Sequence, residues 1–147
     1  MTTTILMIGG SEADRRLVRE SASTPEEPAS LLGPVGTSGA VDWAGHHQPD
    51  LVVLDTRHPR LDPVTFTRQF RQATACAEIP LLLIATANRQ SVCDRALEAG
   101  ASDFIVAPPD PRECRLRIRN LLTLAAERQS AVQCRRAAVG GRRPLKQ

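Results

Sequence analysis

Aromatic side chains are scarce in this sequence. Its 147 residues include one Trp, three Phe and no Tyr. Proteins that bind single-stranded nucleic acid usually stack the bases on aromatic side chains. The composition therefore argues against that class of protein.

Long apolar runs are missing as well, and we expect no leader sequence. No run approaches the roughly 20 residues that cross a bilayer. No basic residue precedes the short apolar run at residues 5–8, as it would in a signal peptide. We therefore expect a cytoplasmic protein without a membrane segment.

Cysteine and histidine do not occur at the spacings of a metal site or a catalytic group. The four cysteines form no C-x-x-C pair, and the three histidines do not lie at zinc-ligand spacing from them. We expect free thiols at Cys76, Cys93, Cys114 and Cys134. No Ser-His-Asp or Cys-His arrangement follows from the spacing of His46-His47, so we expect no enzymatic activity.

Charge is divided unevenly along the chain. Residues 112–147 hold ten Arg or Lys against two Glu, a net charge of +8, whereas residues 1–111 hold nine Arg against fourteen acids, a net charge of −5. A basic segment can contact nucleic acid or another anionic surface. Because aromatic residues are so few, we interpret the basic segment as a solvated helix face that ends in a frayed tail after about Arg135. Binding of nucleic acid is the less favoured interpretation.

Four continuous apolar runs indicate strands that are buried on both faces. They lie at residues 5–8, 51–54, 81–84 and 104–106. Runs without polar alternation are typical of a parallel sheet. A weaker edge strand is expected at residues 31–35, despite Pro34.

Segments with helical periodicity separate these runs, at residues 11–22, 39–47, 62–73, 89–99 and from 111 onward. Ser11 is a suitable N-cap for the first, and Gly100 a suitable end for the fourth. In the third, Arg68 and Arg71 are expected to face the solvent. The alternation of strands and helices predicts an α/β doubly wound sheet.

Around the third predicted strand the sequence resembles a known family. Residues 50–63, D-L-V-V-L-D-T-R-H-P-R-L-D-P, are similar to the phospho-acceptor strand and following loop of response-regulator receiver domains. Residues 96–104, A-L-E-A-G-A-S-D-F, are similar to their fourth helix and fifth strand, and Ile79-Pro80 also matches. The resemblance implies the flavodoxin-like (βα)5 fold with a five-stranded parallel sheet. It implies a receiver domain at residues 1–125, extended at 126–147 by a helix and a basic, disordered tail.

The resemblance is incomplete where the family carries its chemistry. A working receiver joins the acceptor Asp to two carboxylates after the first strand, which bind Mg²⁺, to a Ser or Thr after the fourth strand and to a Lys after the fifth. Asp55 matches the acceptor. The other positions are occupied by Gly9 and Gly10, by Ala85 with Thr86 one place late, and by Ala107.

A single carboxylate is a poor magnesium site, because Mg²⁺ gives up its water reluctantly and requires more anionic charge. We therefore expect no metal and no other cofactor. Arg57, two residues after Asp55, is the candidate cation that pairs with it and mimics a metal-neutralised site. Glu12 and Asp14 come too late in the chain to replace the acidic pair, and we expect them to stabilise the N-terminus of the first helix. Pro108 is retained, which allows a cis peptide bond after Ala107.

These observations predict a non-enzymatic signalling module of the two-component type, a pseudo-receiver that acts through a protein partner. We expect the partner to be a sensor kinase, an output protein or a second copy of the chain. For a second copy, the last helix offers a thin stripe formed by Leu121, Ala125 and Val132, along which two helices could pair. Three alternatives stay open. They are a conventional phosphorelay receiver that is phosphorylated on Asp55, a small-ligand module that uses the turn at Gly9-Gly10, and a nucleic-acid binder that uses the basic tail.

Overall fold

Five parallel strands form the sheet at the centre of the protein. The computed structural model describes residues 2–32, 37–57 and 61–145. The strands are β1 (Thr4–Ile8), β2 (Ser30–Leu32), β3 (Leu51–Asp55), β4 (Leu81–Ala85) and β5 (Asp103–Val106), and they pair in the order β2-β1-β3-β4-β5. Ile5 is the register partner of Leu31 on one side and of Leu51 on the other. The predicted parallel sheet is confirmed.

Helices alternate with the strands as the sequence predicts. They are α1 (Glu12–Ala22), α2 (Thr37–His47), α3 (Pro63–Gln72), α4 (Gln90–Ala99) and α5 (Pro111–Leu145), with short 3-10 turns η1 (Thr74–Cys76) and η2 (Ala87–Arg89) before β4 and α4. The Ser11 hydroxyl accepts a hydrogen bond from the Asp14 N–H and caps α1. Asp62 caps α3 in the same way, and α4 ends at Gly100.

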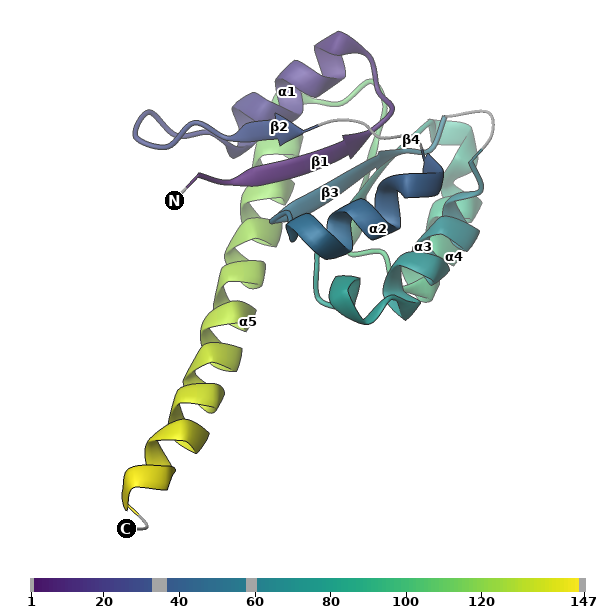
Figure 1. Cartoon of the computed structure of the whole chain (residues 1–147). Coiled ribbons are helices and arrows are strands. Elements are labelled where there is room, and N and C mark those ends of the chain that lie inside the picture. Colours follow the sequence, from purple (N-terminus) through teal and green to yellow (C-terminus); the bar gives the residue numbers. More distant parts are fainter. Residues whose placement is uncertain (1, 33–36, 58–60, 146–147) are drawn as a thin grey trace.

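Each face of the sheet packs against its own set of helices (Figure 1). Leu6 and Leu54 point into the core that the sheet shares with α2, α3 and α4. Their neighbours Met7 and Val53 point into the core shared with α1 and α5. Because both faces are covered, polar alternation along the strands is excluded, which explains the continuous apolar runs.

The second strand and the last helix differ in part from the prediction. Strand β2 ends at Leu32, and the remainder of the expected strand lies outside the described residues. Helix α5 extends as one helix as far as Leu145, over the segment where the sequence suggested a frayed tail. Ala and Arg, which are strong helix formers, dominate residues 135–138, and this favours continuation of the helix. Among the described helices, none combines the length and the apolarity needed to cross a membrane.

Arg71 does not face the solvent, and that prediction is wrong. Its Nε donates to the Gly100 carbonyl at 2.7 Å, and its Nη1 donates to the carbonyls of Cys76 at 2.9 Å and Ile79 at 2.6 Å. Gly100 follows α4 and Cys76 ends η1, where carbonyls lack partners within the helix, and Ile79 lies in the segment before β4. The guanidinium inserted among them satisfies several acceptors at once. Burial lowers the pKa of the Arg71 guanidinium from its ordinary value.

We expect Arg71→Met to lower the free energy of unfolding by about 2–3 kcal/mol, because the apolar stem remains but the buried carbonyls lose their donor. Denaturant unfolding followed by circular dichroism measures this. Arg68→Met, on the exposed side of the same helix, is the matched control and should change stability by no more than about 0.5 kcal/mol. Equal effects of the two variants would contradict this role of Arg71.

Candidate functional site

The carboxyl ends of β1 and β3 lie side by side where the strand order reverses. In a sheet of this order, such a switch point is where functional side chains collect. Ile8 is the register partner of Leu54, so the next residues, Gly9 and Asp55, also come together. A Cβ atom built on Gly9 would lie 3.3 Å from the Cβ atom of Asp55.

Asp55 is the last residue of β3 and is only 6% exposed. Both of its carboxylate oxygens accept hydrogen bonds from Arg57. The Arg57 Nε lies 2.9 Å from Oδ1, and Nη2 lies 3.0 Å from Oδ2. The backbone N–H of Arg57 also donates to Oδ1, at 3.0 Å. The ion pair expected between these two residues is therefore present, in the bidentate geometry that arginine favours with carboxylates.

Arg57 also contacts a second carboxylate, from the other side of the switch point. Its Nη2 donates to Oδ2 of Asp14 at 2.7 Å. Asp14 lies in the first turn of α1, as predicted, but its side chain does more than stabilise that helix end. One guanidinium thus joins α1 to the end of β3.

The electrostatics of this cluster favour the charged arginine. The hydrogen bonds that Arg57 donates to Asp55, and to a smaller extent the one it donates to Asp14, raise the pKa of the guanidinium above its ordinary value, although partial burial acts in the opposite direction. Arg57 is therefore a permanent cation, held between two carboxylates.

Gly9 and Gly10 form a tight turn directly after β1. Their φ angles are +78° and +88°, in the left-handed region that residues with a side chain rarely adopt. A Cβ atom on Gly10 would lie 2.5 Å from the Cε atom of Met7. The turn is packed against the protein's own side chains, so the structure gives the small-ligand alternative no support here.

The remaining positions expected from the resemblance carry one hydroxyl, that of Thr86, and no charged group. Ala85 is buried, and its carbonyl accepts a hydrogen bond from the Ala107 N–H at 2.6 Å. The Thr86 hydroxyl is bonded to the Asn88 side chain. The peptide bond between Ala107 and Pro108 is cis. Of the five chemical positions of the family, Asp55 alone carries a reactive group here.

Sequence reasoning missed a second arginine at this edge of the sheet. Arg89, at the end of η2, donates from Nη1 to the backbone carbonyl of Thr56 at 2.7 Å. The contact ties the start of α4 to the residue after Asp55. No motif identifies Arg89, because its partner is a backbone atom 33 positions away.

The donor set at this edge does not fit the Mg²⁺ that the resemblance implies. Mg²⁺ is usually held through one or two carboxylates together with water and phosphate oxygens. The carboxylates of Asp14 and Asp55 both bind Arg57 instead. Across the described ranges, no three His, Cys, Asp or Glu side chains group closely enough to hold a metal ion.

Comparison with known proteins identifies the family. The model of the response regulator receiver domain matches residues 34–119. The chain belongs to the response regulator receiver family. Gly9 and Gly10 lie before the matched residues, in the part of the chain where the acidic pair is missing.

Two relatives and one solved structure illustrate the similarity of this receiver. The cyclic di-GMP phosphodiesterase response regulator RpfG of Xanthomonas campestris pv. campestris is 38% identical over 94 residues, which cover 64% of this chain and 25% of RpfG. The response regulator PleD of Caulobacter vibrioides is 30% identical over 123 residues, 82% of this chain and 26% of PleD. The signal receiver domain of an HD domain-containing protein from Pseudomonas fluorescens Pf-5 has a TM-score of 0.72 at 17% identity, over 88% of this chain and 93% of that one. The receiver thus spans about a quarter of the length of these two relatives.

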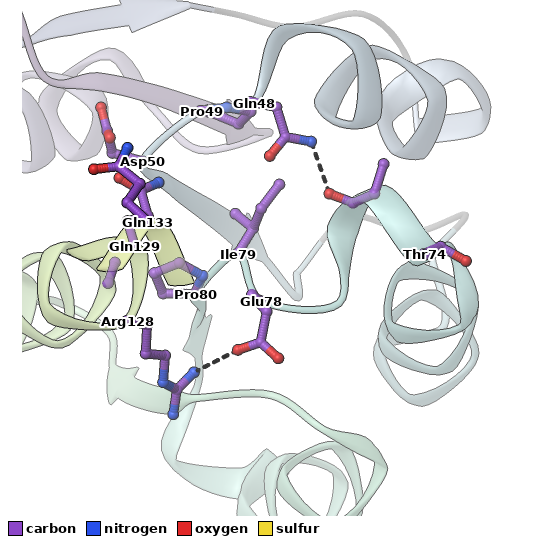
Figure 2. A pocket seen from close by; sticks show the side chains of 12 residues that line it. Gln48, Pro49, Asp50, Thr74, Glu78, Ile79, Pro80, Arg128, Gln129 and Gln133 are labelled. Carbon is purple, nitrogen blue, oxygen red and sulfur yellow. Dashed lines mark hydrogen bonds and ion pairs between the residues drawn. The ribbon is translucent and has the colours of Figure 1, made fainter. Parts of the chain in front are cut away.

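A separate hollow of about 450 Å³ lies at the opposite end of the sheet, before β3 and β4. Figure 2 shows Gln129 and Gln133 of α5 on one side of it and Gln48 on another. The ion pair between Arg128 and Glu78, at 3.6 Å, crosses its rim. This hollow is remote from Asp55, because it adjoins the amino ends of the strands.

We expect Arg57→Met to destabilise the receiver, because it leaves the buried carboxylate of Asp55 without its counter-charge. In a double-mutant cycle with Asp55→Asn, the coupling energy should be about 1–2 kcal/mol, a modest value because Arg57 is partly exposed. Unfolding in urea measures it. A coupling energy near zero would show that the ion pair does not stabilise the fold.

Proposed function

We propose that this receiver is a pseudo-receiver that signals through protein contacts and does not depend on phosphorylation of Asp55. The observation that supports the proposal is the bidentate hydrogen bonding of Arg57 to both oxygens of that carboxylate. Three further positions of the family's phosphorylation chemistry, Gly9, Gly10 and Ala107, carry neither a charge nor a hydroxyl.

The first argument concerns the nucleophile. A carboxylate that accepts a phosphoryl group requires a free oxygen in line with the leaving group. In this receiver Oδ1 of Asp55 accepts two hydrogen bonds and Oδ2 accepts one. Phosphorylation would have to displace the guanidinium first, and would lose its hydrogen bonds.

The second argument concerns charge. An incoming phosphoryl group brings negative charge, which receivers offset with a metal ion and a lysine. In this receiver Arg57 is the cation at Asp55, and its single positive charge is already shared between the carboxylates of Asp55 and Asp14. We infer that Mg²⁺ is not bound and that the site stays in one state.

One feature favours the alternative of a conventional phosphorelay receiver. Asp55 stands at the acceptor position, and the side chain of Arg57 is 36% exposed. The arginine could swing toward solvent and then bind a phosphoryl oxygen. One experiment, the measurement of intact mass after phosphodonor treatment, distinguishes the pseudo-receiver from the conventional phosphorelay receiver.

The partners follow from the family. RpfG and PleD are response regulators of which this chain matches about a quarter. We propose that the receiver has no enzymatic activity of its own and acts on an output protein, a sensor kinase or a second copy, with assembly in place of phosphorylation as the signal.

Intact mass after incubation with a small phosphodonor and Mg²⁺ tests the proposal. We expect no phosphoryl-sized mass gain for the native receiver or for Asp55→Asn, while a competent receiver under the same conditions gains mass. Arg57→Met separates the causes, since a gain in this variant alone would show that the arginine blocks the acceptor. A gain in the native receiver that is lost in Asp55→Asn would establish the conventional function instead.

A further inference from the structure

The hollow of about 450 Å³ beside α5 has the size of a small-molecule site, since pockets for small ligands measure roughly 300–1,000 Å³. Its walls come from α5 and from the segments that precede β3 and β4. Of the stripe predicted on the last helix, Leu121 is buried against the sheet and Ala125 lines this hollow. These two positions therefore face the receiver's own body, and the side chain of Val132 lies outside the described part of the chain.

Asp50 contributes a carboxylate without a counter-charge to this hollow. Its Oδ2 accepts hydrogen bonds from the backbone N–H of Thr4 at 2.8 Å and from the Thr4 hydroxyl at 3.4 Å, and neither donor is charged. Within residues 2–32, 37–57 and 61–145, no cation pairs with this carboxylate and Oδ1 accepts no hydrogen bond. A ligand that brings a positive charge and N–H donors would supply what this half-buried carboxylate lacks.

Gln48 supplies a fixed acceptor beside it. Its φ angle is +50°, and among the described residues it is the one residue other than glycine with a positive φ. Glycine is usual at such a position after a helix, but here the side chain is used. Its Nε2 donates to the carbonyls of Gly45 at 3.0 Å and Ala75 at 2.7 Å. The amide oxygen is thereby turned toward the hollow (Figure 2).

Two further amides and an apolar floor complete this end of the hollow. Gln129 and Gln133 lie one turn apart on α5 and line the same side. The buried side chains of Pro49, Ile79 and Pro80 form the floor. A guanidinium suits these surroundings, because it is planar and weakly hydrated and carries five N–H donors, whereas a lysine ammonium is a strongly hydrated point charge.

The rim of the hollow carries opposite charges side by side. Nη1 of Arg128 lies 3.6 Å from Oε2 of Glu78, which is too long for a hydrogen bond. The two side chains are 63% and 75% exposed, so both groups keep their capacity to bind a ligand. A free amino acid has the complementary pattern, since its ammonium and its carboxylate are attached to one carbon. The ammonium can donate to Glu78, and the carboxylate can accept two hydrogen bonds from Arg128.

We propose that this hollow binds a free α-amino acid with a guanidinium side chain, namely L-arginine. The charged head lies on Arg128 and Glu78, and the guanidinium lies among the oxygens of Asp50 and Gln48. In Figure 2 these two groups of residues are at different ends of the hollow. From Arg128 to Gln133 the helix rises by about 7.5 Å, a length that a long side chain spans and a short one does not. The bound amino acid ties α5 to the segments before β3 and β4.

This inference goes beyond the proposed function and does not depend on it. The hollow adjoins the amino ends of the strands, whereas Asp55 ends β3 at the opposite edge. A receiver that binds no arginine and gains no phosphoryl mass would refute the amino-acid site and leave the pseudo-receiver proposal intact. A receiver that binds arginine and is phosphorylated would do the reverse.

Isothermal titration calorimetry of the full chain at constant ionic strength tests the proposal. We expect L-arginine to bind saturably, one molecule per chain, with a dissociation constant below about 1 mM. Citrulline, in which a neutral urea group replaces the guanidinium, should bind at least roughly tenfold more weakly, because it brings no charge to Asp50. Agmatine, which lacks the carboxylate, should bind roughly threefold more weakly, because the contact that it loses is at the exposed rim. Absence of saturable arginine binding, or equal affinity for arginine and citrulline, would overturn the proposal.

Two variants assign the two ends of the ligand. Asp50→Asn keeps an oxygen that can accept from Thr4 but removes the charge, so it should weaken arginine binding at least roughly tenfold and abolish the preference over citrulline. Arg128→Gln should weaken arginine binding roughly threefold and leave agmatine binding unchanged. Arg135→Gln is the matched control, since it removes the same charge from an exposed position of the same helix outside the lining of the hollow. Circular dichroism shows that each variant is folded. Unchanged arginine binding in both Asp50→Asn and Arg128→Gln would contradict the assignment.

Nuclear magnetic resonance locates the ligand. The side-chain amide signals of Gln48, Gln129 and Gln133 should shift on titration with L-arginine, with the same dissociation constant that calorimetry gives. These three amides line the hollow, so they report binding there independently of the charged residues that the variants alter. Shifts confined to other parts of the receiver would place arginine elsewhere and overturn the proposal.

Discussion

The ionic contact between Arg57 and Asp55 is the interaction on which the functional edge of the sheet depends. A carboxylate that is 6% exposed is costly to keep charged unless a cation and hydrogen bonds compensate it. In this receiver the cation is part of the chain and comes two residues after the acid. Through Asp14 the same guanidinium fixes α1 against the end of β3. The same guanidinium therefore offsets the charge of Asp55 and anchors α1.

The turn after β1 shows why the missing acidic pair is more than a change of side chain. Gly9 and Gly10 both adopt positive φ angles, which cost a residue with a Cβ atom roughly 1–2 kcal/mol each. Carboxylates could return to these positions only with a change of backbone path beside Asp55. The absence of an acidic pair and the geometry of this turn are thus linked, and Arg57 supplies the positive charge beside Asp55.

The sequence predicted the fold well because the fold depends on local patterns. Continuous apolar runs identified four strands, and Ser11 and Gly100 marked helix ends. The ion pair of Asp55 could be predicted because its partner is two residues away. Asp14 and Arg89 could not, since they reach Arg57 and the Thr56 carbonyl across 43 and 33 positions. The solvent-facing position predicted for Arg71 was wrong, because helical periodicity gives no sign of carbonyl groups in other segments. These carbonyl groups require a hydrogen-bond donor, and Arg71 supplies it.

The proposed pseudo-receiver would carry information in a different way from a conventional receiver. A conventional switch alternates between two charge states at the acceptor, and the surrounding loops respond to the difference. Here both carboxylate oxygens of Asp55 accept hydrogen bonds from Arg57, and Arg89 ties the start of α4 to the Thr56 carbonyl. On the proposal that this edge stays in one state, a change in the output comes from what binds the surface. Binding of a partner then depends on concentration and on charge, and the long basic helix that leaves the far end of the sheet is the part of the molecule suited to both.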